Sequence, residues 1–152
     1  MQENDKMPNF ALPRDGGETV SLSDYEGQAL VMFLYPKDDT PGCTLESIEF
    51  TAKQSLFEAA GASIVGLSKD SVESHEKFCQ KHDLKVPLLS DESGELVEAL
   101  GAWKEKNMYG KTFMGIERTT FLVDGTGTIR KVWRNVKVDG HVDEVLEAVR
   151  AL

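Results

Sequence analysis

Cys43 stands where a cysteine thiol can become a nucleophile. Thr40 is placed for a helix N-cap, Pro41 suits the first helical position, and Glu46 falls early in the same predicted helix. Cys43 is therefore expected in the first turn, where free backbone N–H groups and the positive end of the helix dipole favour an anion. Because the thiolate is the reactive form of cysteine, this placement predicts a reactive thiol. The alternative is a small buried residue of the core, which would not need this turn before a helix.

The elements that would position this thiol follow from apolar periodicity. The run Ala29–Tyr35 predicts a buried central strand. A long helix is expected from about Pro41 to Ala60, ended by Gly61. Ser63–Ser68 predicts the next buried strand. Two strands joined by a helix form a βαβ crossover, which we expect to be right-handed.

The rest of the chain alternates in the same way, which is typical of an α/β layer. Shorter strands are expected at Thr19–Leu22, Pro87–Ser90, Thr119–Val123 and Thr128–Trp133, the last two joined as a hairpin. Further helices are expected from a cap at Asp70 or Ser71 to about His82, over Ser93–Leu100, and over His141–Leu152. We expect a single domain spanning residues 1–152, a length that can bury a core. Periodicity alone leaves several three-layer α/β folds open.

Charge and composition exclude some classes of function. Asp and Glu number 26 against 17 Lys and Arg, for a net charge of −9, which argues against nucleic-acid binding. The start Met1–Lys6 has no apolar segment of a secretory signal, and no apolar run approaches membrane-spanning length. Two cysteines without such a signal predict a reducing cytoplasm, where thiols are more often catalytic than structural.

The second cysteine, Cys79, lies in the predicted helix that ends near His82. It is seven residues from Val72 and shares a face with it, which is compatible with a place in the core. His75, Cys79 and His82 also stand at i, i+4 and i+7, a face with metal-ligand chemistry. A metal site needs further ligands, and His141 is the one histidine left. We expect no metal, and we interpret His75 and His82 as partly solvated surface residues.

The segment Tyr35–Glu46 carries a resemblance to a known family. Its Pro-x-x-x-Thr-x-x-Cys pattern resembles the peroxidatic motif of the peroxiredoxins, and the full string resembles the peroxiredoxin Q or bacterioferritin comigratory protein branch. Further matches lie at Met7–Leu12, Pro87–Asp91, Lys106–Gly110 and Gly115–Phe121, so the resemblance covers essentially the whole chain. It implies a thioredoxin-like fold with a central mixed sheet flanked by helices. It also implies thiol-dependent reduction of hydrogen peroxide and organic hydroperoxides, without a cofactor.

The resemblance implies a role for each residue that matches the motif. Cys43 would attack the peroxide and become a sulfenic acid. Thr40 would orient the substrate with its hydroxyl, besides capping the helix, and Pro36 would shield the thiolate from water. Arg118, in the string Glu-Arg-Thr-Thr-Phe, would contact both thiolate and peroxide.

Two further residues would support this site. Gly42 would allow close backbone approach and contribute an N–H, and Glu46 would orient Arg118 or cap the helix. The alternative for Arg118 is a surface ion pair with Glu117 or Glu46.

For Cys79 the resemblance implies the resolving role. Many relatives carry the resolving cysteine five residues after the peroxidatic one, but that position here is Ile48. A subset carries it in the following helix, which Phe78–Lys81 resembles. Cys79 would then close an intramolecular disulfide with Cys43, which thioredoxin would reduce, in a protein expected to be a monomer. Because a disulfide needs Cα atoms within about 7 Å, both the first turn at Cys43 and part of the second helix are expected to unwind.

Two other classes compete with a thiol peroxidase. A thioredoxin-like disulfide reductase would need a second cysteine three residues after Cys43, where Glu46 stands. A redox sensor would pass its oxidation to a partner protein. The segment Trp103–Met114 holds aromatic and methionine residues among lysines. It is compatible with an apolar rim that admits organic hydroperoxides and equally with a loop packed on the core.

Overall fold

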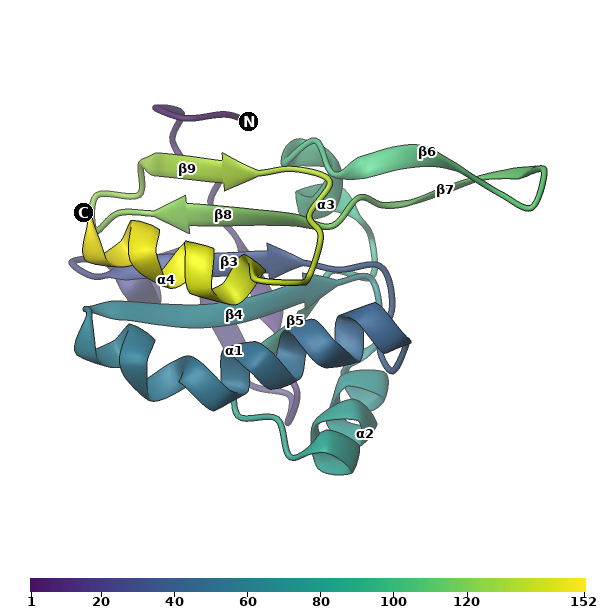
Figure 1. Ribbon diagram of the computed structural model, residues 1–152, viewed down its shortest axis with the longest axis horizontal. Helices are drawn as coiled ribbons and strands as arrows, with labels where there is room; N and C mark the ends of the chain where they lie inside the picture. Colours follow the sequence, from purple (N-terminus) through teal and green to yellow (C-terminus); the bar gives the residue numbers. More distant parts are fainter.

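A five-stranded mixed sheet runs through the centre of the computed structural model, which describes residues 1–152 (Figure 1). Its strand order is β5-β4-β3-β8-β9. The strands are β3 (Ala29–Leu34), β4 (Ala62–Ser68), β5 (Leu88–Ser90), β8 (Thr119–Val123) and β9 (Ile129–Trp133). The central strand β3 pairs parallel with β4 and antiparallel with β8. The predicted βαβ unit and the predicted hairpin are therefore both confirmed.

The register between β3 and β8 determines what lies beside the end of β3. Leu34, the last residue of β3, pairs with Thr119, the first residue of β8. Arg118 precedes Thr119, so the pairing brings this arginine to the edge where the chain leaves β3 toward Cys43. Both strands are almost wholly buried, β3 with apolar side chains throughout and β8 with Phe121–Val123, which holds the register firmly.

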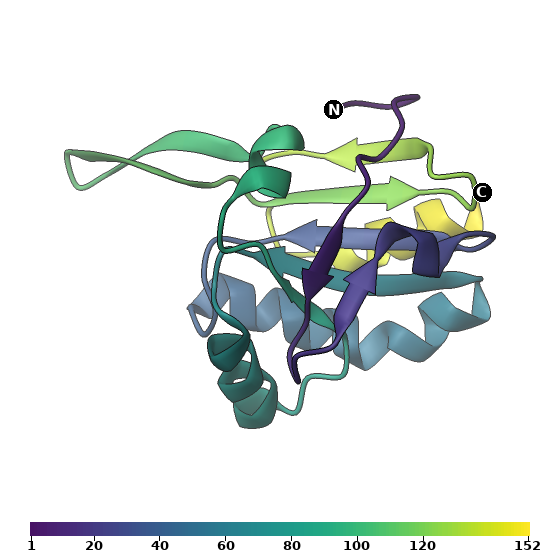
Figure 2. The same ribbon diagram turned by 180° about the vertical axis from the view of Figure 1, so that it is seen from behind.

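Helices and an N-terminal segment cover the two faces of the sheet. The helices α1 (Pro41–Ala59), α2 (Val72–His82) and α4 (His141–Arg150) pack on one face around a core that includes Phe33, Phe50 and Phe78. The opposite face is covered by β1 (Ala11–Pro13), β2 (Thr19–Ser21), the short 3-10 helix η1 (Leu22–Tyr25) and α3 (Glu95–Ala99) (Figure 2). The sheet is thus buried on both sides.

The helix boundaries agree with the capping signals in the sequence. Thr40 is the N-cap of α1 with Pro41 behind it, and Gly61 follows the helix with a φ of 85°, a conformation that favours glycine. Ser71 caps α2 and accepts a hydrogen bond from the Ser74 N–H. The helix α3 is shorter than predicted, although its apolar residues do face the core.

The segment Trp103–Met114 differs from the loop packed on the core that was one interpretation of its sequence. It forms an antiparallel hairpin of β6 (Trp103–Met108) and β7 (Lys111–Ile116) that projects from the body of the molecule (Figure 1). Only its base packs on the core, through Trp103 and Ile116. Its tip residue Tyr109 is 97% exposed.

Candidate active site

Cys43 lies in the first turn of α1 and is only 1% exposed. Its Sγ accepts a hydrogen bond from Arg118 Nη2 at 3.3 Å. The two residues are 75 apart in sequence, and the pairing of β3 with β8 brings them together. The guanidinium and the helix N-terminus thus place positive charge beside the sulfur atom.

Glu46 holds the arginine from the other side. Its Oε1 accepts a hydrogen bond from Arg118 Nη1 at 2.6 Å, and its side chain is fully buried. Of the two roles predicted for Glu46, the structure shows the contact with Arg118. Burial raises the pKa of Glu46 to about 7, and the guanidinium offsets only part of this effect. Burial alone would lower the pKa of Arg118, but Glu46 and Cys43 outweigh it and raise that pKa.

Gly42 and Pro36 shape the backbone around the thiol. A Cβ added at Gly42 would lie 3.1 Å from Arg118 Nη2, closer than most such contacts, so the absence of a side chain lets the guanidinium approach. The close backbone approach predicted at Gly42 is therefore an approach to the Arg118 guanidinium. Pro36 is half-buried and stands at the start of the loop from β3 to α1.

The Thr40 hydroxyl does not cap α1, although Thr40 occupies the N-cap position. It donates instead to the Lys37 carbonyl oxygen at 2.8 Å. The capping part of the prediction for this side chain is therefore wrong: its hydroxyl is turned toward the Lys37 carbonyl, and no N–H of the helix donates to Oγ1. The lone pairs of Oγ1 remain available to accept a hydrogen bond from a substrate.

Lys106, on β6, is a second cation near the thiol that we did not predict. Burial and the neighbouring Arg118 lower its pKa, while Cys43 acts in the opposite direction. The hairpin thus reaches the active site at its base. The sequence could have indicated Lys106 only through the family resemblance, since Lys106 lies in one of the segments that carry it.

Cys79 is half-buried in α2, and neither cysteine forms a disulfide. Burial and the carboxylates of Asp15 and Asp38 raise the pKa of Cys79 to about 12. The thiol is therefore a poor nucleophile while α2 is folded. The Cys79 carbonyl accepts the N–H groups of Asp83 and Leu84, which close the last turn of the helix.

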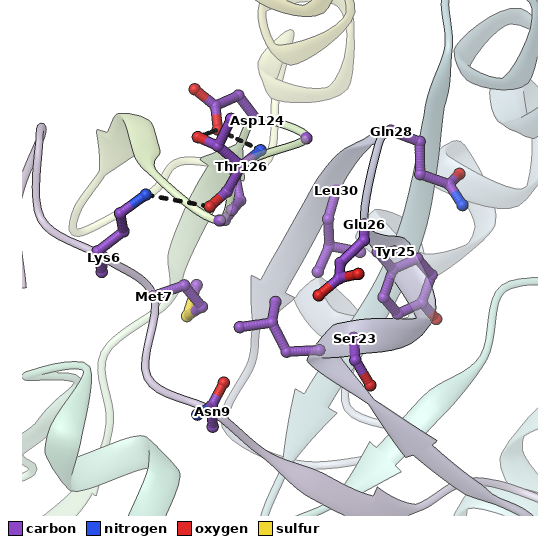
Figure 3. Close-up of a pocket in the computed structure, with 14 residues that line it drawn as sticks. Lys6, Met7, Asn9, Ser23, Tyr25, Glu26, Gln28, Leu30, Asp124 and Thr126 are labelled. Atoms are coloured by element: carbon purple, nitrogen blue, oxygen red, sulfur yellow. Dashed lines mark hydrogen bonds between the residues drawn. The ribbon is translucent and has the colours of Figure 1, made fainter.

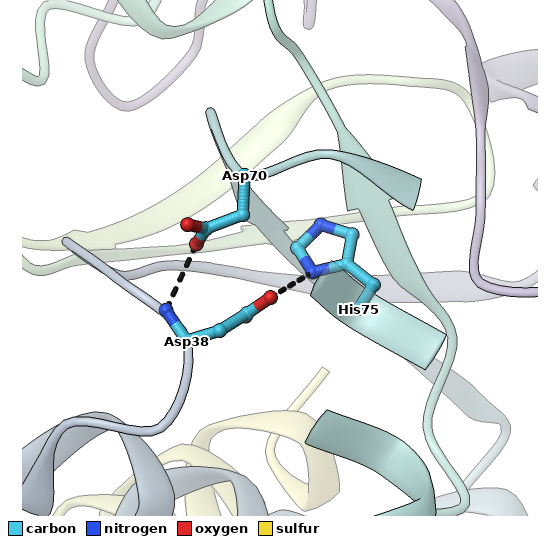
Figure 4. A group of neighbouring side chains, drawn as sticks. All are labelled: Asp38, Asp70 and His75. Atoms are coloured by element: carbon cyan, nitrogen blue, oxygen red, sulfur yellow. Dashed lines mark hydrogen bonds and ion pairs between the residues drawn. The ribbon is translucent and has the colours of Figure 1, made fainter. Parts of the chain in front are cut away.

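His75 is fully buried, so its predicted place at the surface is wrong. Its Nδ1 lies 2.7 Å from Asp38 Oδ2, and its Nε2 lies 2.9 Å from the Leu89 carbonyl oxygen (Figure 4). The partner Asp38 is 37 residues away, which periodicity does not reveal. His82 is part-exposed, as predicted, and pairs with Asp39. The two histidines contact different aspartates, His75 with Asp38 and His82 with Asp39, and do not form a metal-binding face with Cys79.

A cavity of about 530 Å³ lies far from this chemistry. It is lined by the N-terminal segment, the η1 region and the β8–β9 turn, including Lys6, Tyr25 and Asp124 (Figure 3). It sits beside the start of β3, whereas Cys43 follows the end of that strand. No predicted site residue lines it.

Comparison with known proteins gives consistent matches. The model of the AhpC/TSA family matches residues 4–132. Peroxiredoxin Bcp of Bacillus subtilis is 48% identical over 145 residues, which cover 95% of this chain and 92% of that protein. A solved structure of Xanthomonas campestris peroxiredoxin Q superimposes with a TM-score of 0.89 at 48% identity, covering 93% of this chain and 90% of that one. A structure of the bacterioferritin comigratory protein from the same organism, described for its alkyl peroxide reduction, has a TM-score of 0.89 at 46% identity over the same shares.

Proposed function

This chain belongs to the peroxiredoxins, in the Bcp or peroxiredoxin Q branch, and we propose that Cys43 carries its peroxide step, Cys79 its resolving step, and thioredoxin its reduction. The protein has the thioredoxin-like fold of that family and is a thiol peroxidase. Its substrates include alkyl hydroperoxides, the compounds that the Xanthomonas campestris relative reduces.

The first step is a displacement on oxygen. The Cys43 thiolate attacks the terminal oxygen of ROOH, the O–O bond breaks, and the released RO⁻ takes a proton to leave as an alcohol or water. Cys43 becomes a sulfenic acid and is oxidised by two electrons. Arg118, fixed by Glu46, stabilises the charge on the thiolate and then on the oxygen atoms of the transition state. The Thr40 hydroxyl donates its proton to the Lys37 carbonyl oxygen. Its oxygen atom is therefore free to accept a hydrogen bond from the peroxide O–H.

The second step returns the thiol to a reducible form. The Cys79 thiol condenses with the Cys43 sulfenic acid, an S–S bond forms, and water leaves. Thioredoxin then reduces the disulfide by thiol–disulfide exchange and is itself oxidised. A reducing cytoplasm, where thioredoxin works, suits the two free thiols of this chain. No helix in the structure combines the length and hydrophobicity needed to cross a membrane.

One contact carries this proposal: the hydrogen bond from Arg118 to Cys43, with Glu46 on the other side of the guanidinium. A cysteine that merely filled the core would not need a buried arginine held at its sulfur. A disulfide reductase would need a second thiol in this first turn, and Glu46 occupies that position.

Cysteine variants and intact mass test the assignment. Cys43→Ser should lower peroxidase activity below about a hundredth of wild type while the fold is kept, because only the thiolate can attack. With one equivalent of peroxide, the intact mass of wild type should fall by two hydrogen atoms, because one intramolecular disulfide forms. Cys79→Ser should gain one oxygen under the same conditions and a second when more peroxide is added, since no internal thiol captures the sulfenic acid. If Cys79→Ser turned over with thioredoxin as well as wild type, Cys79 would be a residue of the core and the enzyme would work with one cysteine.

A further inference from the structure

The loop before α1 is tied to α2 through the buried side chain of Asp38 (Figure 4). Asp38 Oδ1 accepts a hydrogen bond from the Tyr35 hydroxyl at 2.6 Å. Asp38 Oδ2 accepts from Ser74 Oγ at 2.8 Å and lies 2.7 Å from His75 Nδ1. The backbone N–H of Asp38 donates to Asp70 at 2.8 Å. Asp38 thus joins the end of β3, the loop that carries the active site, and the first turns of α2.

The partners of His75 fix its protonation. The Leu89 carbonyl can only accept a hydrogen bond, so Nε2 must carry a proton. Asp38 accepts hydrogen bonds from Tyr35 and Ser74, and a proton on Nδ1 of His75 makes the contact at 2.7 Å a third one. With both ring nitrogens protonated, His75 is an imidazolium that faces Asp38 in a site with no access to solvent.

This ion pair joins the two segments that must unwind before Cys43 and Cys79 can meet in the resolving step. Cys43 follows the Asp38 loop, and Cys79 lies one turn after His75 on α2. Opening the turn that carries Cys79 leaves Val72–Phe78, which is seven residues and too short to persist as a helix without outside contacts. The contacts from Asp38 to Ser74 and His75 are those that hold this remnant in place.

Building on the resolving role proposed for Cys79, we propose that Asp38 and His75 are positioning residues that form a proton-operated latch on the resolving step. The latch holds α2 folded while the peroxide reacts, and it must break, with release of one proton from His75, before Cys79 reaches Cys43.

The direction of the pH dependence follows from the surroundings of His75. Burial alone would lower its pKa, but the Asp38 carboxylate outweighs burial and raises it, with a contribution from Asp70. The other titratable group that faces it is Tyr35, whose own pKa is raised well above the ordinary value and which stays neutral. The latch is fully effective below the unfolded His pKa of about 6.5 and is lost as the pH rises through the raised, folded value. In that window, each opening of α2 releases one proton.

The resolving rate should therefore carry an extra proton dependence. In the opened state Cys79 reacts as a thiolate, which gives a tenfold rise in rate per pH unit up to about pH 8.5. In wild type the latch adds a second tenfold rise in the rate of disulfide formation per pH unit. This rise begins at about pH 6.5 and ends at the raised pKa of His75 in the folded protein. The experiment is rapid quench of the reduced protein with one equivalent of peroxide between pH 6 and 9, with disulfide formation followed by intact mass. His75→Asn should form the disulfide at least tenfold faster at pH 6, and its rate should show a single tenfold rise per pH unit up to about pH 8.5.

A matched control and a second variant complete the test. His82→Asn removes an ion pair between the same loop and the same helix, but at the part-exposed Asp39, and it should keep the wild-type pH profile. Asp38→Asn removes the other member of the ion pair and should show the same pH profile of disulfide formation as His75→Asn. Amide exchange of α2 in the reduced proteins gives a second reading, because opening should rise with pH in wild type and not in the two latch variants.

Three results would decide against the latch. Equal pH slopes for the disulfide step in wild type, His75→Asn and Asp38→Asn would overturn it and leave the peroxidase intact. A slower peroxide step in His75→Asn at every pH would show a general loss of active-site structure instead of a latch. Absence of any disulfide between Cys43 and Cys79 in wild type would overturn both the resolving role and the latch.

Discussion

At the scale of single residues, the guanidinium of Arg118 lies between Glu46 and Cys43 and donates a hydrogen bond to each. Glu46 Oε2 has no hydrogen-bond partner although it is buried, so the carboxylate is held by the arginine alone. An unpaired buried charge is costly, and Glu46 and Arg118 therefore depend on each other.

Removing the arginine should slow the peroxide step more than the resolving step. Arg118→Ala should lower the rate of sulfenic acid formation by roughly 10²–10³, because the transition state loses a positioned donor. Arg118→Lys should recover only part of the rate, since an ammonium lacks the fork that contacts both Cys43 and Glu46. Stopped-flow measurement with hydrogen peroxide checks this, with the exposed Lys131→Ala as control. A normal rate in Arg118→Ala would reduce the contact to a structural ion pair.

Glu46 should make the stability of the protein fall between mildly acidic and neutral pH. Its pKa rises from 4.5 to about 7 on folding, so the folded state binds this proton more tightly than the unfolded chain. The stabilisation is fully present below pH 4.5 and is lost as the pH approaches 7. Over this window wild type should lose about 2–3 kcal/mol of unfolding free energy relative to Glu46→Gln.

Urea unfolding at the two ends of that window, under reducing conditions, measures this difference. Glu49→Gln on the same helix is the matched control and should follow wild type. A parallel fall in wild type and Glu46→Gln would mean that Glu46 is already ionised at pH 4.5 by its contact with Arg118.

At the scale of elements, α2 is the helix whose stability matters most for turnover. It has eleven residues, its N-terminus is capped by Ser71, and its C-terminus is closed by Asp83 in the left-handed conformation. Short helices of this kind depend on caps and tertiary contacts more than on intrinsic propensity. The cap is therefore a place where local opening can be changed without touching either cysteine.

Ser71→Ala should raise the local opening of α2. Loss of a serine cap costs about 1 kcal/mol, which corresponds to an increase in opening of roughly fivefold. Hydrogen exchange of the amides around Cys79 should show this increase, while the amides of β3 and β8 stay unchanged. Ser71→Gly is the control, since glycine at an N-cap costs only a few tenths of a kcal/mol. Equal exchange in Ser71→Ala and wild type would show that the Asp38 contacts alone set the opening.

Elements with a regular apolar pattern could be predicted from the sequence, and paired elements at the surface could not. The strand Ala29–Leu34 is apolar throughout, Thr119–Val123 is rich in β-branched and apolar residues, and capping residues marked the starts of α1 and α2. The hairpin β6–β7 was not predicted, because both of its faces are largely exposed and its side chains do not alternate between apolar and polar.

The same limit applies to the site. Local spacing predicted Cys43 at a helix start, but Arg118 came from the family resemblance, because no local pattern brings together residues 75 apart. Asp38 and His75 were missed for the same reason. An aspartate in a turn and a histidine on a helix both look like surface residues until the fold buries them against each other.

At the scale of the whole molecule, the hairpin β6–β7 projects from the body of the protein and only its base packs on the core (Figure 1). Lys106, whose pKa responds to Cys43, pairs across the hairpin with Phe113. Directly opposite residues in an antiparallel pair share a face, so Phe113 lies on the face of Lys106. Met114 pairs with Glu105 and lies on the other face. The predicted apolar rim, if present, is therefore formed by Phe113.

Phe113→Ser should lower activity with a bulky organic hydroperoxide and leave hydrogen peroxide unaffected. Phe113 is 43% exposed, and a substrate alkyl group that covered this area would gain on the order of 1 kcal/mol, or roughly a fivefold effect in kcat/KM. Met114→Ser, at 50% exposure on the opposite face, is the matched control and should behave as wild type with both substrates. Equal losses in the two variants, or a loss with hydrogen peroxide, would exclude a rim at Phe113.

Because β8 is translated long after β3, a newly made chain holds its cysteine without the arginine that activates it. Cys43 and Arg118 are separated by 75 residues, which a ribosome adds in about 4–15 s. During that interval β3 has no partner on its β8 side, and the thiol has only the chemistry of an ordinary cysteine. Cys79 has already been made when the arginine arrives. The order of synthesis therefore delivers both cysteines before the arginine that contacts Cys43.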